Sequence, residues 1–159
     1  MEVNVGDMVR GMMKKRGIKI NTDSIREFSI SLKKREGSIM LAKDIKDELK
    51  KGRGNAIVDS IRNIEEVNYL REKVKNARIV LVAVTAPSKK RYSRMISRSR
   101  PDDIRNYEEF KSRDRKEERM GLERAISNAD FIISNSASQS SLKASVLKLL
   151  AIIESKEMV

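Results

Sequence analysis

Apolar residues gather in four short runs along the chain. Residues 2–5 alternate polar and apolar side chains and predict a short strand, and residues 56–58 form a brief apolar run. Residues 79–84 are apolar without alternation, a pattern typical of a strand that is covered on both faces in a parallel sheet. Residues 129–133 predict the last strand.

Between these runs the spacing of apolar residues is helical. The predicted helices cover residues 6–16, 22–37, 38–50, 64–75, 89–127 and 142–155, with a break at Pro101 and a restart at Asp102-Asp103. Strands that alternate with helices indicate an α/β fold, an open parallel sheet with flanking helices, in a single domain of residues 1–159. In such sheets ligands bind beyond the carboxyl ends of the strands.

The composition excludes several kinds of chemistry. The chain has no Cys and no His, which excludes disulfides, thiol nucleophiles, structural zinc sites and histidine acid–base catalysis. The longest strongly apolar run is too short to cross a bilayer, and the first ten residues lack the apolar stretch of a signal peptide. We therefore expect a cytoplasmic protein without a membrane partner.

The net charge of +12 predicts affinity for phosphates or polyanions. A nucleic acid is therefore one predicted partner. The chain has only three Tyr, three Phe and no Trp, however, so few rings are available to stack on single-stranded bases.

The run of residues 56–58 ends at Asp59, and Arg62 follows three residues later. A carboxylate at a strand end can hold a water on a magnesium ion, and an arginine beside it can bind a phosphate with two parallel hydrogen bonds. The alternative is a helix-capping aspartate followed by a solvated arginine. Position alone does not separate the two.

Three arginines, Arg91, Arg94 and Arg98, lie on one face of the predicted helix because their spacing is i, i+3 and i+7. Arg100 follows at the break. Such a face predicts an anion site, while the alternative is a solvated charged face balanced by the acidic residues that follow. Those acidic residues are Glu108, Glu109, Asp114, Glu117 and Glu118.

Two further places carry candidate chemistry. Asp7 and Arg10 lie at a predicted helix start after a strand, which favours an anion site or, alternatively, an N-cap with an exposed arginine. Residues 134–138, which include Asn135 and Ser136, follow the last strand and predict either a loop around a base or a polar turn.

Taken in chain order, these segments resemble one protein family. Residues 5–10 look like the acceptor-side segment of nucleoside monophosphate kinases, and residues 57–62 like their apolar-Asp-Gly-x-Arg element. Residues 91–100 resemble an arginine-bearing lid, and residues 129–135 resemble the adenine-side strand and loop shared with dephospho-CoA kinases. The nearest family is a group of archaeal adenylate-kinase-related proteins of the P-loop nucleotide kinase type.

The resemblance implies a role for each candidate residue. It implies ATP and Mg²⁺ as cofactors, a nucleotide-like acceptor, an acceptor-side helical insertion of about residues 6–50 and a lid of about residues 88–127. The implied acceptor-side residues are Asp7, Arg10, Arg35 and Arg62. The implied catalytic residues are Arg94, Arg98, Arg100 and Asp59, with Asp59 near the magnesium ion through water, and Asn135 and Ser136 lie by the adenine.

The chain departs from this family in two places. Ser60 stands where the family has glycine, and serine tolerates a positive φ poorly. No Gly-x-x-x-x-Gly-Lys-Ser/Thr loop is present, although this loop holds the phosphates of ATP in the family. We therefore expect very weak ATP binding and little or no kinase activity.

In the family fold, the strand that precedes this loop lies between the strands predicted at 56–58 and 79–84. Either the chain lacks one βα unit of roughly 30 residues or the sheet is rearranged, and we expect the former. The alternatives to a kinase-type domain are a basic nucleic-acid-binding domain and a regulatory domain that has lost its chemistry. A homo-oligomer is compatible with each of them.

Overall fold

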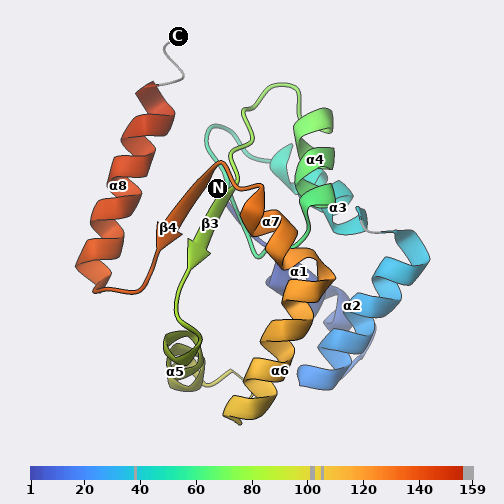
Figure 1. The fold of residues 1–159 in the computed structure, drawn as a ribbon. Helices are drawn as coiled ribbons and strands as arrows, with labels where there is room; N and C mark the ends of the chain where they lie inside the picture. The colour runs from blue at the N-terminus through green and yellow to red at the C-terminus, as the bar shows by residue number, and fades with distance from the viewer. Residues whose placement is uncertain (38, 101–102, 105, 156–159) are drawn as a thin grey trace.

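Among the described residues, four short strands form two separate parallel pairs in the computed structural model (Figure 1). Strand β1 (Glu2–Asn4) pairs with β2 (Ile57–Asp59), and β3 (Val82–Thr85) pairs with β4 (Phe131–Ser134). The structure describes residues 1–37, 39–100, 103–104 and 106–155, without the side chains of residues 22, 33–36, 119 and 120. It is an α/β fold with two small parallel sheets and flanking helices.

Helices account for most of the described residues. Their bounds are α1 Val5–Lys15, α2 Thr22–Glu36, α3 Met40–Leu49, α4 Ile64–Lys73, α5 Ser88–Arg98, α6 Tyr107–Glu117, the kinked turn η1 Glu118–Leu122, α7 Glu123–Ser127 and α8 Gln139–Ser155. Among the described residues, no helix is both long and apolar enough to cross a membrane.

The first half of the chain packs around the β1–β2 pair. One cluster joins Val3 of β1 to Ala42 and Ile45 of α3, both completely buried, and to Leu70 of α4. A second cluster joins α1, α2 and α3 around the buried side chain of Met13. These contacts follow from the helical spacing of apolar residues, which places them on one face of each helix.

The lid has a small core of its own. The buried residues Met95, Ile104 and Phe110 pack against the rings of Tyr92 and Tyr107. The ring centroids of Tyr92 lie 5.1 Å from Tyr107 and 5.5 Å from Phe110, in tilted arrangements that aromatic pairs prefer. This cluster holds α5 against α6, and it contains three of the six aromatic residues of the chain.

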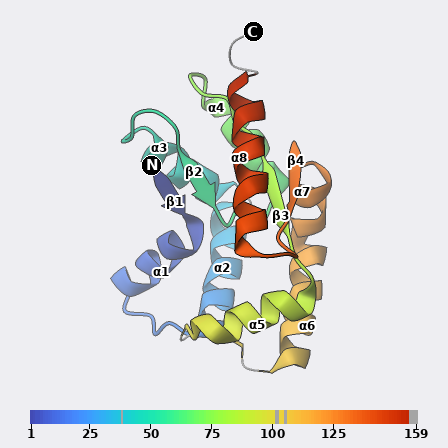
Figure 2. The ribbon, with the colours of Figure 1, turned by 90° about the vertical axis from the view of Figure 1, so that its left-hand side faces the viewer.

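Side-chain contacts join the two halves across the space between β2 and β3. The carboxylate of Asp130, just before β4, accepts hydrogen bonds from Arg71 of α4 at 2.6 Å and from the backbone N–H of Leu81 at 2.7 Å. Arg124 of α7 lies 3.1 Å from Glu65 of α4. In both ribbon views β3 lies between β4 and the β1–β2 pair (Figures 1 and 2).

The prediction of one open sheet is wrong, because β2 and β3 share no ladder in the part of the chain that the structure describes. The separation falls at the position where the sequence predicts a missing strand. The prediction that residues 79–84 are covered on both faces is also wrong. The strand begins at Val82, and the Val84 side chain is 59% exposed. A strand at the edge of a two-stranded sheet has too few neighbours to be buried.

Three helix boundaries differ from their predictions because side-chain caps decide them. Helix α1 begins at Val5, since Asn4 rather than Asp7 accepts the hydrogen bond of a first-turn N–H. The lid helix restarts at Tyr107, where Asn106 is the cap, so the predicted restart at Asp103 is wrong. Helix α8 begins at Gln139, three residues before the predicted start, behind the hydroxyl of Ser138.

Ser60 has a φ of 73°, in the left-handed region that favours glycine. The substitution Ser60→Gly should therefore raise the free energy of unfolding by about 0.5–1 kcal/mol. Denaturant unfolding of both proteins measures the difference. The matched control is Ser93→Gly at an exposed position in the middle of α5, which should lower the free energy of unfolding by about 0.5 kcal/mol. Equal destabilisation by both substitutions would contradict the strain at Ser60.

Candidate functional site at the carboxyl ends of the strands

All four strands end in a polar side chain. The last residues are Asn4 of β1, Asp59 of β2, Thr85 of β3 and Ser134 of β4. The pairing register places Asn4 opposite Asp59 and Thr85 opposite Ser134. Each parallel pair therefore presents two polar groups at its carboxyl edge, which is where α/β sheets bind ligands.

At the first edge, Asn4 connects the strand end to the start of α1. Its amide nitrogen donates to Asp59 at 2.9 Å, and its oxygen accepts from the backbone N–H of Asp7 at 3.0 Å. Asp7 lies 3.4 Å from Arg10, one turn along the helix. The structure thus places Asp59, Asp7 and Arg10 around Asn4, a residue that the sequence analysis did not single out although asparagine is a preferred N-cap.

At the second edge, α5 of the lid contacts the loop that follows β4. Arg94 donates to the carbonyl oxygen of Asn135 at 3.2 Å, and Lys90 donates to the carbonyl oxygen of Ser136. The loop is held to β3 by the N–H of Asn135, which donates to the Thr85 carbonyl oxygen at 2.7 Å. The structure therefore brings together Arg94, Asn135 and Ser136, as well as Lys90, which the sequence analysis did not single out.

Arg91 has a structural role in this arrangement. Its guanidinium binds both carboxylate oxygens of Asp114 on α6 and lies over the ring of Phe110, 5.5 Å from the centroid. Its Nε donates to the carbonyl oxygen of Ala86 at 2.9 Å. The hydrogen bonds to Asp114 raise the pKa of Arg91 above its usual value. Arg91 therefore fastens α5 to α6, and its charge is balanced by Asp114 within the lid.

Arg98 and Arg100 meet at Asp103 rather than at the strand ends. Arg98 donates to the Asp103 carboxylate at 2.6 Å, and the backbone N–H of Arg100 donates to it at 2.8 Å. Burial raises the pKa of Asp103, but these hydrogen bonds and the two positive charges outweigh burial, so the pKa lies below its usual value. A shallow depression of about 460 Å³ lies beside them and is lined partly by Arg100 and Tyr92.

Arg62 contacts the lid through Glu117. Its guanidinium lies 2.5 Å from the Glu117 carboxylate on α6, which also lies 3.9 Å from Arg113. The Arg62 side chain is 51% exposed, so it is both solvated and held by an ion pair. The Glu117 carboxylate therefore lies between two guanidinium groups, a position that also suits a phosphate.

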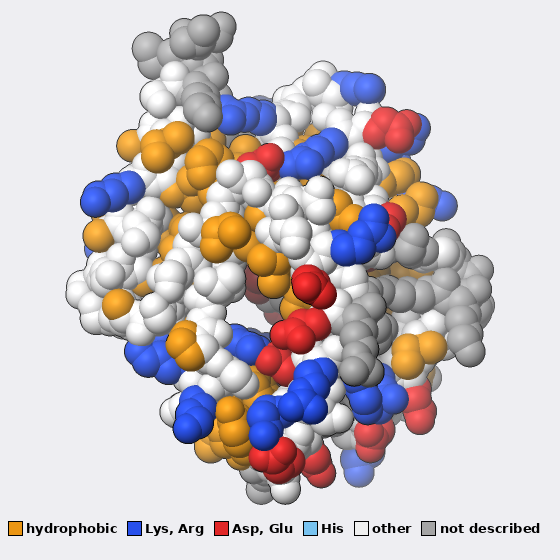
Figure 3. Space-filling model, in the orientation of Figure 1, with side chains coloured by type: hydrophobic (Ala, Val, Ile, Leu, Met, Phe, Trp, Pro, Cys, Tyr) orange, Lys and Arg blue, Asp and Glu red, His pale blue; other side chains and the backbone are white. Residues whose placement is uncertain are grey.

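The space-filling view shows where these groups face. The molecule is hollowed near its centre, beyond the carboxyl end of β3 and next to the lid, and both basic and acidic side chains lie on the rim of the hollow (Figure 3). The side chain of Arg35, a predicted acceptor-side residue, lies outside the described residues. No group of three or more acidic side chains that could hold a metal ion occurs in the described ranges.

The fold and this polar edge define an α/β domain with a candidate anion site at its strand ends. No protein-family model matches the chain. It is 33% identical to a UPF0200 protein of Thermococcus kodakarensis over 97% of this chain and 85% of that protein. A UPF0200 protein of Thermoplasma acidophilum is also 33% identical, over 94% and 81% of the two chains.

The chain therefore belongs to the UPF0200 family. A longer UPF0200/UPF0201 protein of Archaeoglobus fulgidus is 33% identical over 93% of this chain but only 46% of its own length. All three relatives are archaeal, as the sequence resemblance predicts. Their names state no ligand and no reaction, so the kinase resemblance stays a prediction.

The Asp103 carboxylate should make the lid sensitive to acid. Because the pKa of Asp103 is lowered in the folded state, its contribution to the free energy of unfolding is fully present above the unfolded pKa of about 4. This contribution is lost as the pH falls through the lower pKa of the folded state. Asp103→Asn should lower the free energy of unfolding at pH 7 by about 1–3 kcal/mol. Urea unfolding between pH 7 and 2.5 should show this difference shrinking with acid, while Glu108→Gln, at an exposed position, should change little. A pH-independent difference would contradict the argument.

Proposed function

We propose that this protein binds a nucleotide-like phosphorylated ligand at the carboxyl edge of its strands, in a domain of the nucleotide-kinase type. The observation that carries the proposal is the contact between the lid and the β4–α8 loop. There, Arg94 and Lys90 donate to carbonyl oxygens of Asn135 and Ser136 rather than to carboxylates. Their charges are available to an anion, since neither forms an ion pair within the described ranges.

The loop itself offers groups that suit a base and its sugar. The hydroxyls of Ser134 and Ser136 lie 2.7 Å apart, and the backbone of Asn135 is anchored to Thr85. Polar backbone and hydroxyl groups on an anchored loop can form hydrogen bonds to a base without large rearrangement. Phosphates extending from such a base toward α5 would meet Arg94 and Lys90.

The carboxyl edge of the β1–β2 pair supplies groups for a second ligand. Asp59, Asp7 and Arg10 surround Asn4, and Arg62 reaches the lid through Glu117. In a phosphoryl transfer from ATP to a nucleotide-like acceptor, Arg62 would bind the acceptor phosphate in place of Glu117. Asp59 would hold a water of the magnesium ion, whose charge would offset that of the phosphates. Protein groups in this reaction mainly position and stabilise charge.

The pairing of the lid arginines argues against a nucleic-acid site. Arg91 and Arg98, which share a helix face with Arg94, are bound by Asp114 and Asp103. Nucleic-acid binding relies on a stripe of cationic side chains, each of which displaces a counterion from a backbone phosphate. Of the three arginines, Arg94 alone lacks a carboxylate partner in the part of the chain that the structure describes, which suits a small anion better than a nucleic-acid backbone.

The proposal is tested by removing the charge of Arg94, which contacts the loop after β4. Arg94→Gln should weaken AMP binding about tenfold, because it removes a hydrogen bond between charged groups. Titration followed by NMR gives the affinity, and we expect the largest shifts at the amides of Ser134, Asn135 and Ser136. The matched control is Arg115→Gln, at an exposed position on α6, which should leave the affinity unchanged.

Two results would contradict the proposal. One is an equal loss of AMP binding in both variants, which would indicate only the net charge. The other is tight RNA or DNA binding that falls steeply with salt and is lost when Arg91, Arg94 and Arg98 are replaced together. That result would favour the nucleic-acid-binding alternative.

ATP should bind this chain only weakly. The chain has no glycine-lysine loop, so the backbone N–H groups and the lysine that usually surround the β- and γ-phosphates are missing. We expect a dissociation constant for Mg–ATP of roughly 1 mM or more, a binding free energy of about −4 kcal/mol or weaker. Isothermal titration calorimetry measures it, and micromolar affinity for this chain would disprove the expectation.

A further inference from the structure

Helix α1 contains two glycines, Gly6 in its first turn and Gly11 near its middle. Glycine weakens a helix because it loses more backbone freedom on folding than any other residue. Both glycines have a negative φ, which other residues adopt equally well. The backbone conformation therefore does not require glycine at either position.

The space around the two glycines differs. A Cβ atom at residue 6 would lie 2.9 Å from Nη1 of Arg10 and 3.2 Å from Oδ1 of Asn4. Cβ atoms in proteins do not come within 3.0 Å of such an atom, so a side chain at residue 6 would push the Arg10 guanidinium away. A Cβ atom at residue 11 would meet no described atom within 4 Å. Of the two, Gly6 is the glycine whose missing side chain makes room for its neighbours.

The two side chains next to Gly6 belong to the carboxyl edge of the β1–β2 pair. Asn4 ends β1, donates to Asp59 at 2.9 Å and caps α1. The Arg10 side chain extends back toward the start of α1, lies 3.4 Å from Asp7 and is only 23% exposed. A cation near the amino-terminal end of a helix is unfavourable, because that end carries a partial positive charge. An anion bound at this edge would offset both positive charges.

We propose that Gly6 is a positioning residue for the phosphate of the second ligand. Its lack of a side chain lets the Arg10 guanidinium lie against the start of α1, beside Asn4. An arginine that is already held in place loses less side-chain freedom on binding, so it binds an anion more tightly. Gly6 acts through Arg10 and Asn4 rather than by contact with the ligand. The inference rests on the function proposed above, which places Arg10 among the groups for the second ligand.

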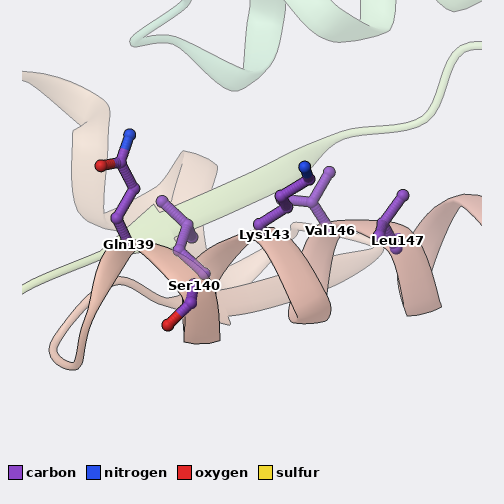
Figure 4. A pocket seen from close by; sticks show the side chains of 6 residues that line it. Gln139, Ser140, Lys143, Val146 and Leu147 are labelled. Atoms are coloured by element: carbon purple, nitrogen blue, oxygen red, sulfur yellow. The ribbon is translucent and has the colours of Figure 1, made fainter.

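The apolar groove on α8 offers no comparable arrangement among the residues that the structure describes. It has a volume of about 530 Å³, and its lining residues all belong to α8. Figure 4 shows Gln139, Lys143, Val146 and Leu147 along it, with Lys143 as the one charged side chain among the described lining residues. Binding sites need several polar groups that converge on the ligand. The β1–β2 edge meets this requirement better than the groove does.

The test compares Gly6→Ala with Gly11→Ala, since both place the best helix former in α1. Gly11→Ala should raise the melting temperature by about 2–4 °C and leave AMP binding unchanged. Gly6→Ala should bind AMP about fivefold more weakly, because Arg10 is no longer held in place, without lowering the melting temperature. Titration followed by NMR gives the affinity from the amides of Asp7 and Asp59. The Nε–H signal of Arg10 should shift in Gly6→Ala alone.

A double variant separates positioning from general damage to α1. Arg10→Gln should weaken AMP binding about tenfold. Adding Gly6→Ala should change this weaker affinity by less than about twofold, because no guanidinium remains to be displaced.

Four results would overturn the inference. They are an additive loss in the double variant, an unchanged affinity in Gly6→Ala, a Gly6→Ala chain that fails to fold, and a lack of AMP-induced shifts at the β1–β2 edge. In each case the Arg94→Gln titration, read at the loop after β4, decides separately whether the function proposed above stands.

Discussion

The separation of β2 from β3 is the constraint on which the rest of this structure depends. Backbone hydrogen bonds hold each parallel pair together, but side chains join the pairs: Asp130 binds Arg71 of α4 and the N–H of Leu81, and Arg124 binds Glu65. Exposed ion pairs contribute little to stability, typically below about 1 kcal/mol each. The two halves are therefore joined less firmly than a continuous sheet would join them, and the strands that face the gap keep apolar side chains exposed.

The charged side chains of this protein form specific pairs that its net charge of +12 does not reveal. The basic residues of the lid fall into two groups, those that bind a carboxylate and those that bind backbone carbonyl oxygens. Arg91 and Arg98 are bound by Asp114 and Asp103 and fix the geometry of α5, whereas Arg94 and its neighbour Lys90 reach backbone carbonyl oxygens beside the strand ends. This division fixes α5 against the rest of the lid and leaves the charges of Arg94 and Lys90 beside the polar strand ends.

Membership of the UPF0200 family agrees with the archaeal resemblance in the sequence but brings no reaction with it. The functional argument therefore rests on the site. Asn4 and Asp59 at one edge, and Thr85 and Ser134 at the other, lie where α/β sheets bind ligands. The two edges belong to different strand pairs.

The sequence by itself determined the α/β class, the order of the strands and most helices, because apolar spacing is a local property. Comparison with the resembled family also singled out Ser60, whose φ is 73°, but the predicted single open sheet is two separate pairs. Caps at Asn4, Asn106 and Ser138 moved three helix starts, since one side-chain hydrogen bond decides such a boundary.

Only the tertiary structure decided which arginine meets which partner. Arg91, Arg94 and Arg98 have equivalent spacing on one helix face, yet Asp114, Asn135 and Asp103 reach them from segments that are distant or folded back. Pairing across such distances depends on packing and on long-range charge, and neither is encoded in local spacing.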